Sequence, residues 1–258
     1  KRKETAHTPK GPKSVHFFGT DEALSFAEKV GGQLLVTVNA GTGSPEEAAE
    51  WVQYINKKGS DSRISRRVTY WEVGNELYIK GDDLAAKAST MNPEKYAERF
   101  LKFVKAMRTV DSSLKIGAIG GEDYGYYSLV GYPDWNKIVL SRAGKEIDFL
   151  SVHNAYAPLL ISGGEKDVET VYSAMLAAPI LIRENFKTLS KQIEFLPKDD
   201  AVRIKIAVTE WGPFYHIDPK SRFIDHVKTL GSALYVASVM KVFIESPRVE
   251  IANFFMLA

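Results

Sequence analysis

Short apolar segments alternate with longer amphipathic segments along the whole chain. The short segments are rich in β-branched residues, which is typical of parallel strands buried on both faces. They are bounded by glycine and polar residues that favour turns. We expect strands at 34–38, 68–73, 114–119, 147–152, 204–209 and 249–252.

The longer segments carry helix signals. Ser44 precedes Pro45 and Glu47, which is the pattern of an N-cap, a first-turn proline and a capping box. Asn92 and Pro93 begin another segment, in which apolar residues recur at helical spacing as far as Met107. We expect helices at 20–30, at 45–57, from 93 to beyond 107, in the segment after Pro133, at 169–191 and at 222–245.

This alternation predicts an α/β fold with a parallel sheet and right-handed crossovers. The pattern alone fits either a doubly wound open sheet or a closed barrel. Six expected strands are fewer than the eight of a (β/α)8 TIM barrel, so either the sheet is open or the first two barrel strands are absent from the chain. We expect residues 1–16 to form a polar arm and 17–258 to form one catalytic barrel portion.

Composition excludes several other classes of protein. A length of 258 residues with 45% hydrophobic residues fits one large domain. The net charge of +2 gives no electrostatic case for binding nucleic acid or an anionic membrane. No segment approaches the roughly 20 apolar residues of a membrane span, and no cysteine is available for a disulfide or a thiolate site. The cellular location stays open.

Two glutamates follow the ends of different expected strands. Asn75 and Glu76 follow the second strand, and Glu210 follows the fifth. The carboxyl ends of parallel strands are where α/β folds bind ligands and carry out chemistry. Cleavage of a glycosidic bond needs one protonated and one ionised carboxyl group at the same site. The alternative is that each glutamate is a strand-end charge with a structural duty.

The segments Gly-Asn-Glu at 74–76 and Thr-Glu-Trp at 209–211 resemble the two signatures of clan A glycoside hydrolases. The resemblance narrows to the α-L-arabinofuranosidases of glycoside hydrolase family 51 through four further segments. These are Phe-Gly-Thr-Asp-Glu at 18–22, Val-Asn-Ala-Gly-Thr-Gly-Ser-Pro-Glu-Glu-Ala at 38–48, Phe-Leu-Ser-Val-His at 149–153 and Ile-Ala-Asn at 251–253. It implies that the expected strands are barrel strands three to eight.

The resemblance also implies roles for individual residues. Glu76 would be the acid/base and Glu210 the nucleophile of a double displacement, with Asn75 bonded to the sugar 2-hydroxyl. The other implied substrate-binding residues are His153, Tyr156, Asn39 and Trp211. From the residues alone, Asn39 could instead shape its turn, His153 could be a satisfied buried histidine, and Trp211 could pack under the barrel mouth.

The expected function is removal of terminal α-L-arabinofuranosyl residues from plant polysaccharides by a retaining mechanism. The sequence leaves open another clan A activity (β-xylosidase, endo-glucanase or xylanase), a non-catalytic carbohydrate-binding barrel, and an unrelated open-sheet protein. The five histidines show no paired ligand spacing, so we expect no metal and no cofactor. We expect an oligo- or polysaccharide substrate, and the absent barrel strands and a β-sandwich domain in the same polypeptide or a partner. A homo-oligomer is left open.

Overall fold

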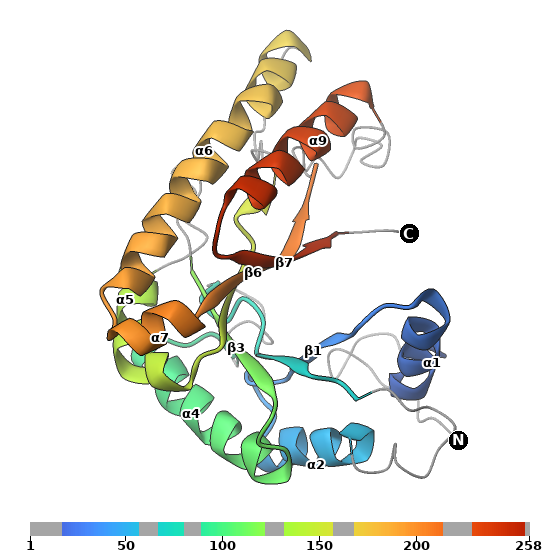
Figure 1. The fold of residues 1–258 in the computed structure, drawn as a ribbon, viewed down its shortest axis with the longest axis vertical. Helices are drawn as coiled ribbons and strands as arrows, with labels where there is room; N and C mark the ends of the chain where they lie inside the picture. The colour runs from blue at the N-terminus through green and yellow to red at the C-terminus, as the bar shows by residue number, and fades with distance from the viewer. Residues whose placement is uncertain are drawn as a thin grey trace.

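The computed structural model describes residues 17–56, 67–79, 89–121, 132–156, 168–213 and 229–255 (Figure 1). Its centre is one parallel sheet in which the main strands follow one another in chain order. They are β1 (Leu35–Val38), β2 (Tyr70–Val73), β3 (Lys115–Ile119), β4 (Phe149–Val152), β6 (Lys205–Gly212) and β7 (Val249–Phe254), with the short β5 (Ala155–Tyr156) paired to the end of β6.

Helices cover the outer face of this sheet, as Figure 1 shows. Neighbouring helices pack against one another, α2 with α4, α4 with α5 and α6 with α9. The helices are α1 (Thr20–Val30), α2 (Pro45–Asn56), α4 (Pro93–Val110), α5 (Trp135–Ala143), α6 (Val168–Glu194), α7 (Lys198–Arg203) and α9 (Leu230–Glu245), with a 3-10 turn at Gly144–Glu146. None of those in the described ranges is long and apolar enough to cross a membrane.

The predicted start signals are present at two helices. The Ser44 hydroxyl accepts the amide of Glu47 at 3.1 Å before α2. The Asn92 side chain accepts the amide of Lys95 at 2.9 Å before α4, with a proline in the first turn. These contacts satisfy amides that have no partner within the helix, and they fix where each helix begins.

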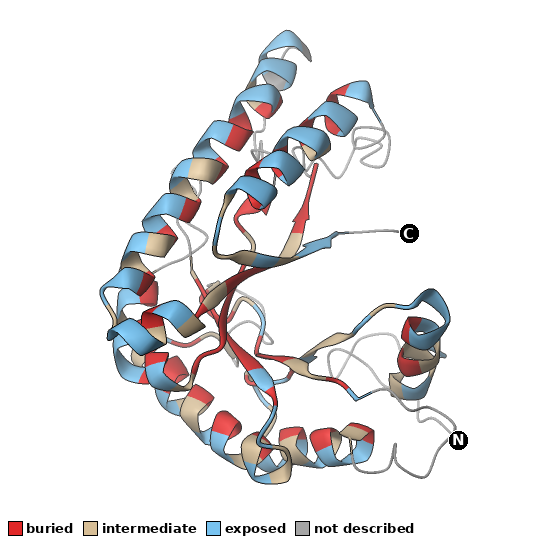
Figure 2. Ribbon diagram, in the orientation of Figure 1, coloured by how far each residue is buried: buried red, intermediate tan, exposed pale blue. Residues whose placement is uncertain are grey.

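The hydrophobic core lies between the sheet and the helices (Figure 2). Residues at alternate strand positions, such as Trp71, Ile116 and Leu150, are fully buried, as expected of side chains that face covering helices. On the helix side the largest fully buried side chains include Tyr96, Phe100, Phe103, Met107, Trp135 and Ile182.

The sheet curls, and its inner face carries a different set of side chains. Thr37 of β1, Glu72 of β2, Ser151 of β4 and Thr209 of β6 are joined there by hydrogen bonds. Strands β2 and β4, which β3 separates in the sheet, therefore contact each other on the inner side, as in a barrel. The prediction of a parallel barrel portion is confirmed, and the described strands form a curled half of a barrel.

Some element boundaries were predicted wrongly. Strand β6 continues beyond 209 to Gly212, and β7 continues beyond 252 to Phe254, because the two strands pair on through Trp211 and Phe254. The helix α7 and the strand β5 were not predicted. The expected helix at 222–245 is described from Leu230, and its first part, like the polar arm at 1–16, lies outside the described residues.

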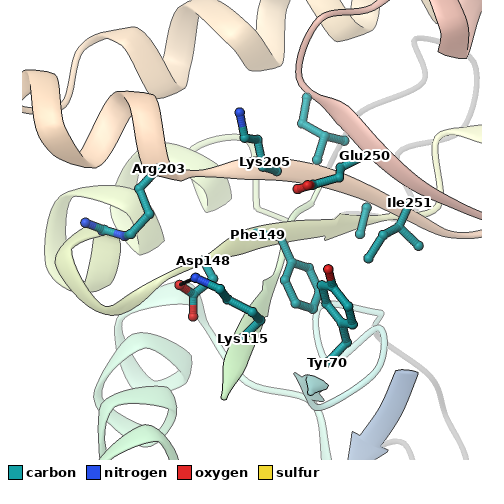
Figure 3. A pocket seen from close by; sticks show the side chains of 10 residues that line it. Tyr70, Lys115, Asp148, Phe149, Arg203, Lys205, Glu250 and Ile251 are labelled. Carbon is teal, nitrogen blue, oxygen red and sulfur yellow. Dashed lines mark ion pairs between the residues drawn. The ribbon is translucent and has the colours of Figure 1, made fainter. Parts of the chain in front are cut away.

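A cavity of about 180 Å³ opens at the amino ends of the strands (Figure 3). It is lined by the first residues of β2, β3, β4 and β6, namely Tyr70, Lys115, Phe149 and Lys205. Lys115 lies 3.6 Å from Asp148 within it. Because parallel α/β folds bind substrates at the opposite, carboxyl ends of the strands, this cavity is not where we place the chemistry.

Candidate active site

Glu76 lies in a tight loop just after β2. Its φ is 48°, and it is the one residue other than glycine with a positive φ in the described part of the chain. Gly74 has a φ of 86°, and a Cβ there would lie 2.8 Å from Cδ1 of Leu77. Glycine is therefore needed at 74 for the chain to turn, and Glu76 is held in a strained conformation. Such strain at a non-glycine residue is a common feature of functional sites.

Glu210 reaches the same region from β6 through a β-bulge. Val208 pairs with Ala252 and Trp211 with Phe254, so β6 has one more residue than β7 between these pairs. The extra residue interrupts the alternation of side chains that a regular strand imposes. Thr209 and Glu210 consequently both lie within reach of His153.

His153 joins the two glutamates. Its Nδ1 lies 2.7 Å from a carboxylate oxygen of Glu76, and its Nε2 lies 3.9 Å from one of Glu210 and 3.1 Å from the hydroxyl of Thr209. The imidazole side chain is 8% exposed, whereas each glutamate side chain is 32% exposed. The site thus holds two solvent-accessible carboxylates on either side of one buried ring.

Opposing effects act on the pKa of His153. Burial by itself lowers the pKa of the imidazole. The hydrogen bond to Glu76 and the charges of Glu210, Glu76 and Glu72 act in the opposite direction, and together they raise the pKa above its ordinary value. A proton is therefore readily held between the ring and Glu76.

A third carboxylate, Glu72, lies beneath this pair. It is 3% exposed and accepts the hydroxyl of Thr37 at 2.9 Å and that of Ser151. Burial raises the pKa of Glu72, although these two hydrogen bonds and the nearby His153 oppose the shift. The hydroxyls around Glu72 were not predicted, and only the period-two alternation of inward residues could have indicated them.

The other predicted binding residues have different surroundings. Asn75 is exposed and forms no hydrogen bond with another described residue. The side-chain oxygen of Asn39 accepts the amides of Gly41 at 3.1 Å and Thr42 at 3.0 Å, so it shapes its own turn. The side chain of Tyr156 lies outside the described residues.

Trp211 is buried, with 4% of its surface exposed. Its ring meets Phe243 and Phe254 edge-on at centroid distances of 4.9 and 5.1 Å. Its indole nitrogen has no hydrogen-bond partner among the described residues. Packing, one of the two interpretations offered from the sequence, accounts for the position of this ring.

No group of three or more histidine or carboxylate side chains within the described ranges is placed to hold a metal ion. The arrangement at His153 suits acid/base chemistry by side chains. One carboxylate there is hydrogen-bonded to His153 and the other lies 3.9 Å from the same ring.

Comparison with known proteins identifies the family. The alpha-L-arabinofuranosidase 1 domain family matches residues 1–138, which is more than half of the chain. The chain belongs to this family. The probable alpha-L-arabinofuranosidase C of Aspergillus terreus is 28% identical over 258 residues, covering 90% of this chain and 47% of that protein. The intracellular exo-alpha-L-arabinofuranosidase of Bacteroides ovatus is 26% identical over 219 residues, covering 78% of this chain and 39% of that protein.

Solved structures agree with the family assignment. A thermostable GH51 alpha-L-arabinofuranosidase from Thermotoga petrophila superposes with a TM-score of 0.74 at 25% identity. The superposition covers 96% of this chain and 48% of that one. The present chain therefore spans about half the length of the curated and solved arabinofuranosidases that it matches.

Proposed function

We propose that this protein is a retaining glycoside hydrolase that releases terminal α-L-arabinofuranosyl residues from plant polysaccharides. The observation that carries the proposal is the placement of Glu76 and Glu210 against the two nitrogens of one imidazole. Family membership supports the substrate class, since relatives of this chain are named arabinofuranosidases.

In the proposed mechanism Glu76 is the acid/base and Glu210 the nucleophile. Glu76 gives its proton to the leaving oxygen while Glu210 attacks the anomeric carbon, and a glycosyl-enzyme forms. Water then attacks the anomeric carbon, Glu76 takes up the proton of that water, and the sugar leaves. The buried His153 between the carboxylates holds Glu76 in place for both steps.

The retaining outcome that we propose requires the carboxyl groups of Glu76 and Glu210 to lie close together. Retaining enzymes hold their carboxyl groups about 5–5.5 Å apart, whereas inverting enzymes need about 6.5–9.5 Å to admit a water. Asn75, exposed beside Glu76, is the residue we propose for the sugar 2-hydroxyl, and the loop of Asn39 lies at the end of the neighbouring strand.

Hydrolysis of a panel of aryl glycosides by the full-length protein tests this function. We expect release of the aryl group from the α-L-arabinofuranoside and little from the β-xyloside or β-glucoside. Cleavage of a β-xyloside or β-glucoside alone would keep the reaction but overturn the sugar. Binding of oligosaccharides without any cleavage would overturn catalysis and favour a carbohydrate-binding barrel.

A further inference from the structure

An unbroken series of hydrogen bonds connects the buried Glu72 to the proposed acid/base. Ser151 contacts Glu72, and its hydroxyl lies 2.5 Å from that of Thr209. The Thr209 hydroxyl lies 3.1 Å from Nε2 of His153, whose Nδ1 lies 2.7 Å from Glu76. We call these five side chains the relay. It crosses β2, β4 and β6 and ends in a carboxylate at each end.

Counting protons limits the states of the relay. Each of its four hydrogen bonds needs one proton. Ser151 and Thr209 supply one each, and a neutral imidazole supplies one. The fourth proton must therefore belong to Glu72, to Glu76 or to a cationic His153. The relay therefore holds one transferable proton. Whether that proton lies on Glu76 depends on whether Glu72 is ionised.

The direction of the hydrogen bonds follows from the state of Glu72. When Glu72 is ionised, Ser151 donates to it, Thr209 donates to Ser151, and Nε2–H of the imidazole donates to Thr209. A neutral His153 then has only a lone pair at Nδ1, so Glu76 must hold the proton of their shared hydrogen bond. When Glu72 is protonated, every bond reverses, Nδ1 becomes the donor, and Glu76 is an ionised acceptor.

We propose that Glu72 is a positioning residue that, through the relay, keeps the transferable proton on Glu76. The inference rests on the proposed function, because a general acid must hold a proton before it can deliver one. An ionised Glu72 fixes Nε2 as the protonated nitrogen of His153. The lone pair at Nδ1 then accepts from the Glu76 carboxyl group and stabilises its protonated form.

The proton balance of the reaction fits this arrangement. In the first step the O–H bond of Glu76 breaks, and its proton bonds to the leaving oxygen while Glu210 attacks. In the second step Glu76 regains a proton from the attacking water. In this proposal the hydroxyls of Ser151 and Thr37 hold the charge on Glu72 against the effect of burial, and Nε2–H stays directed at Thr209. Glu72 touches no reacting atom.

Other titratable groups face the relay in the described part of the chain. Glu210 lies 3.9 Å from Nε2 of His153, and its charge favours a proton on the ring. Tyr96 lies on the helix side of β2 with its hydroxyl bonded to backbone, and burial raises its pKa well above the ordinary range. Tyr96 therefore stays neutral and does not compete for the proton of the relay.

The first test is the pH dependence of kcat/KM for an aryl α-L-arabinofuranoside. Three variants disrupt the relay. Glu72→Gln removes its ionised end, and Ser151→Ala and Thr209→Val each remove a hydroxyl from its middle. Each should move the alkaline limb of the profile to lower pH by about one unit, the shift expected from loss of one hydrogen bond to a charged group. Thr37→Val is the matched control, because Thr37 also donates to Glu72 but lies off the relay. It should move the limb by less than half as much.

The double variant Glu72→Gln with Ser151→Ala separates the relay from a simple field effect. Once Ser151 is gone, loss of the Glu72 charge should move the limb no further. An equal shift in both backgrounds would overturn the relay and leave only the charge of Glu72. A fall in kcat with an unmoved limb in all three single variants would show that Glu72 has a structural role alone.

The second test does not depend on catalysis. The ¹⁵N chemical shifts of the imidazole, assigned through a His153→Gln variant, report which nitrogen carries the proton. We expect Nε2–H with an unprotonated Nδ1 once the pH exceeds the raised pKa of the ring, and a change of this state in Glu72→Gln. An Nδ1–H tautomer in the wild type would overturn the inference even if the enzyme is active. If the expected tautomer is found in a protein that cleaves no glycoside, the proposed function is overturned and the relay stands.

Discussion

Tyr96 of α4 inserts its hydroxyl between β2 and β3 just ahead of the Glu76 loop. Lys115 donates its amide to the carbonyl of Thr69 at 2.9 Å. Four residues further along both strands, the same pairing would join the amide of Ile119 to the carbonyl of Val73. The phenol occupies this place instead, accepting the Ile119 amide at 2.7 Å and donating to the Val73 carbonyl at 2.8 Å. It thus holds both strands at the end where the candidate site begins.

The substitution Tyr96→Phe leaves this amide and this carbonyl without a partner in a fully buried position. An unsatisfied buried donor or acceptor costs about 1–3 kcal/mol, and the strands can close part of the gap. We therefore expect the free energy of unfolding to fall by about 2–4 kcal/mol. For a domain of this size that is a drop in Tm of about 4–16 °C.

Urea unfolding and thermal melting of the two proteins provide the measurement. Tyr235→Phe is the matched control, because the Tyr235 hydroxyl is equally buried but makes one bond within the described ranges, to the carbonyl of Ala155 at 2.7 Å. It should cost about 1 kcal/mol, since one acceptor is left unpaired. If Tyr96→Phe costs no more than Tyr235→Phe, the phenol does not bridge the strands and the reasoning is refuted.

Two further predictions concern the charge of a salt-bridged aspartate and a close backbone approach. Burial alone would raise the pKa of Asp111, but its hydrogen bonds, led by that from Arg67, hold it at about 2, below the ordinary 3.8. The charge thus stabilises the fold above pH 3.8 and stops doing so as the pH falls to about 2. Asp111→Asn should cost about 1–2 kcal/mol at neutral pH, with solvent screening at the half-exposed Arg67 reducing the effect, and the difference in urea midpoint should shrink in acid. A difference in urea midpoint between Asp111→Asn and the wild type that stays constant as the pH falls to about 2 would contradict this account. A Cβ at Gly117 would lie 2.0 Å from the ring of Phe149, so Gly117→Ala should cost about 1–3 kcal/mol of overpacking in urea unfolding. The control Gly32→Ala meets no atom closer than 3.4 Å, and equal midpoints for the two variants would argue against the close packing.

Much of the fold could be predicted from the sequence, because the chain marks its own elements. The alternation of apolar strands with capped helices predicted the six main strands and their parallel pairing, and Ser44 and Asn92 begin helices as expected. The register shift between β6 and β7 could not be predicted. A bulge depends on how two strands that are distant in sequence pair, and neither strand shows it alone.

The candidate site was predicted in part. Strand ends and their neighbouring residues indicated Glu76 and Glu210, because carboxyl ends of parallel strands meet at one edge of a sheet. Ser151 and Thr209 carry no such signal, since each is an ordinary polar residue until the curl of the sheet brings it against Glu72 or His153. Convergence across the inside of a barrel is a property of the closed sheet rather than of a local segment.

Rescue by azide tests the roles of the two glutamates most directly. Glu76→Ala and Glu210→Ala should both lose hydrolysis of the aryl α-L-arabinofuranoside in the full-length protein. Added azide should restore turnover of Glu76→Ala and give a glycosyl azide of retained configuration, because the azide attacks a glycosyl-enzyme formed on Glu210. An azide product of inverted configuration from Glu76→Ala, or hydrolysis by Glu210→Ala at the wild-type rate, would contradict the assignment of acid/base and nucleophile.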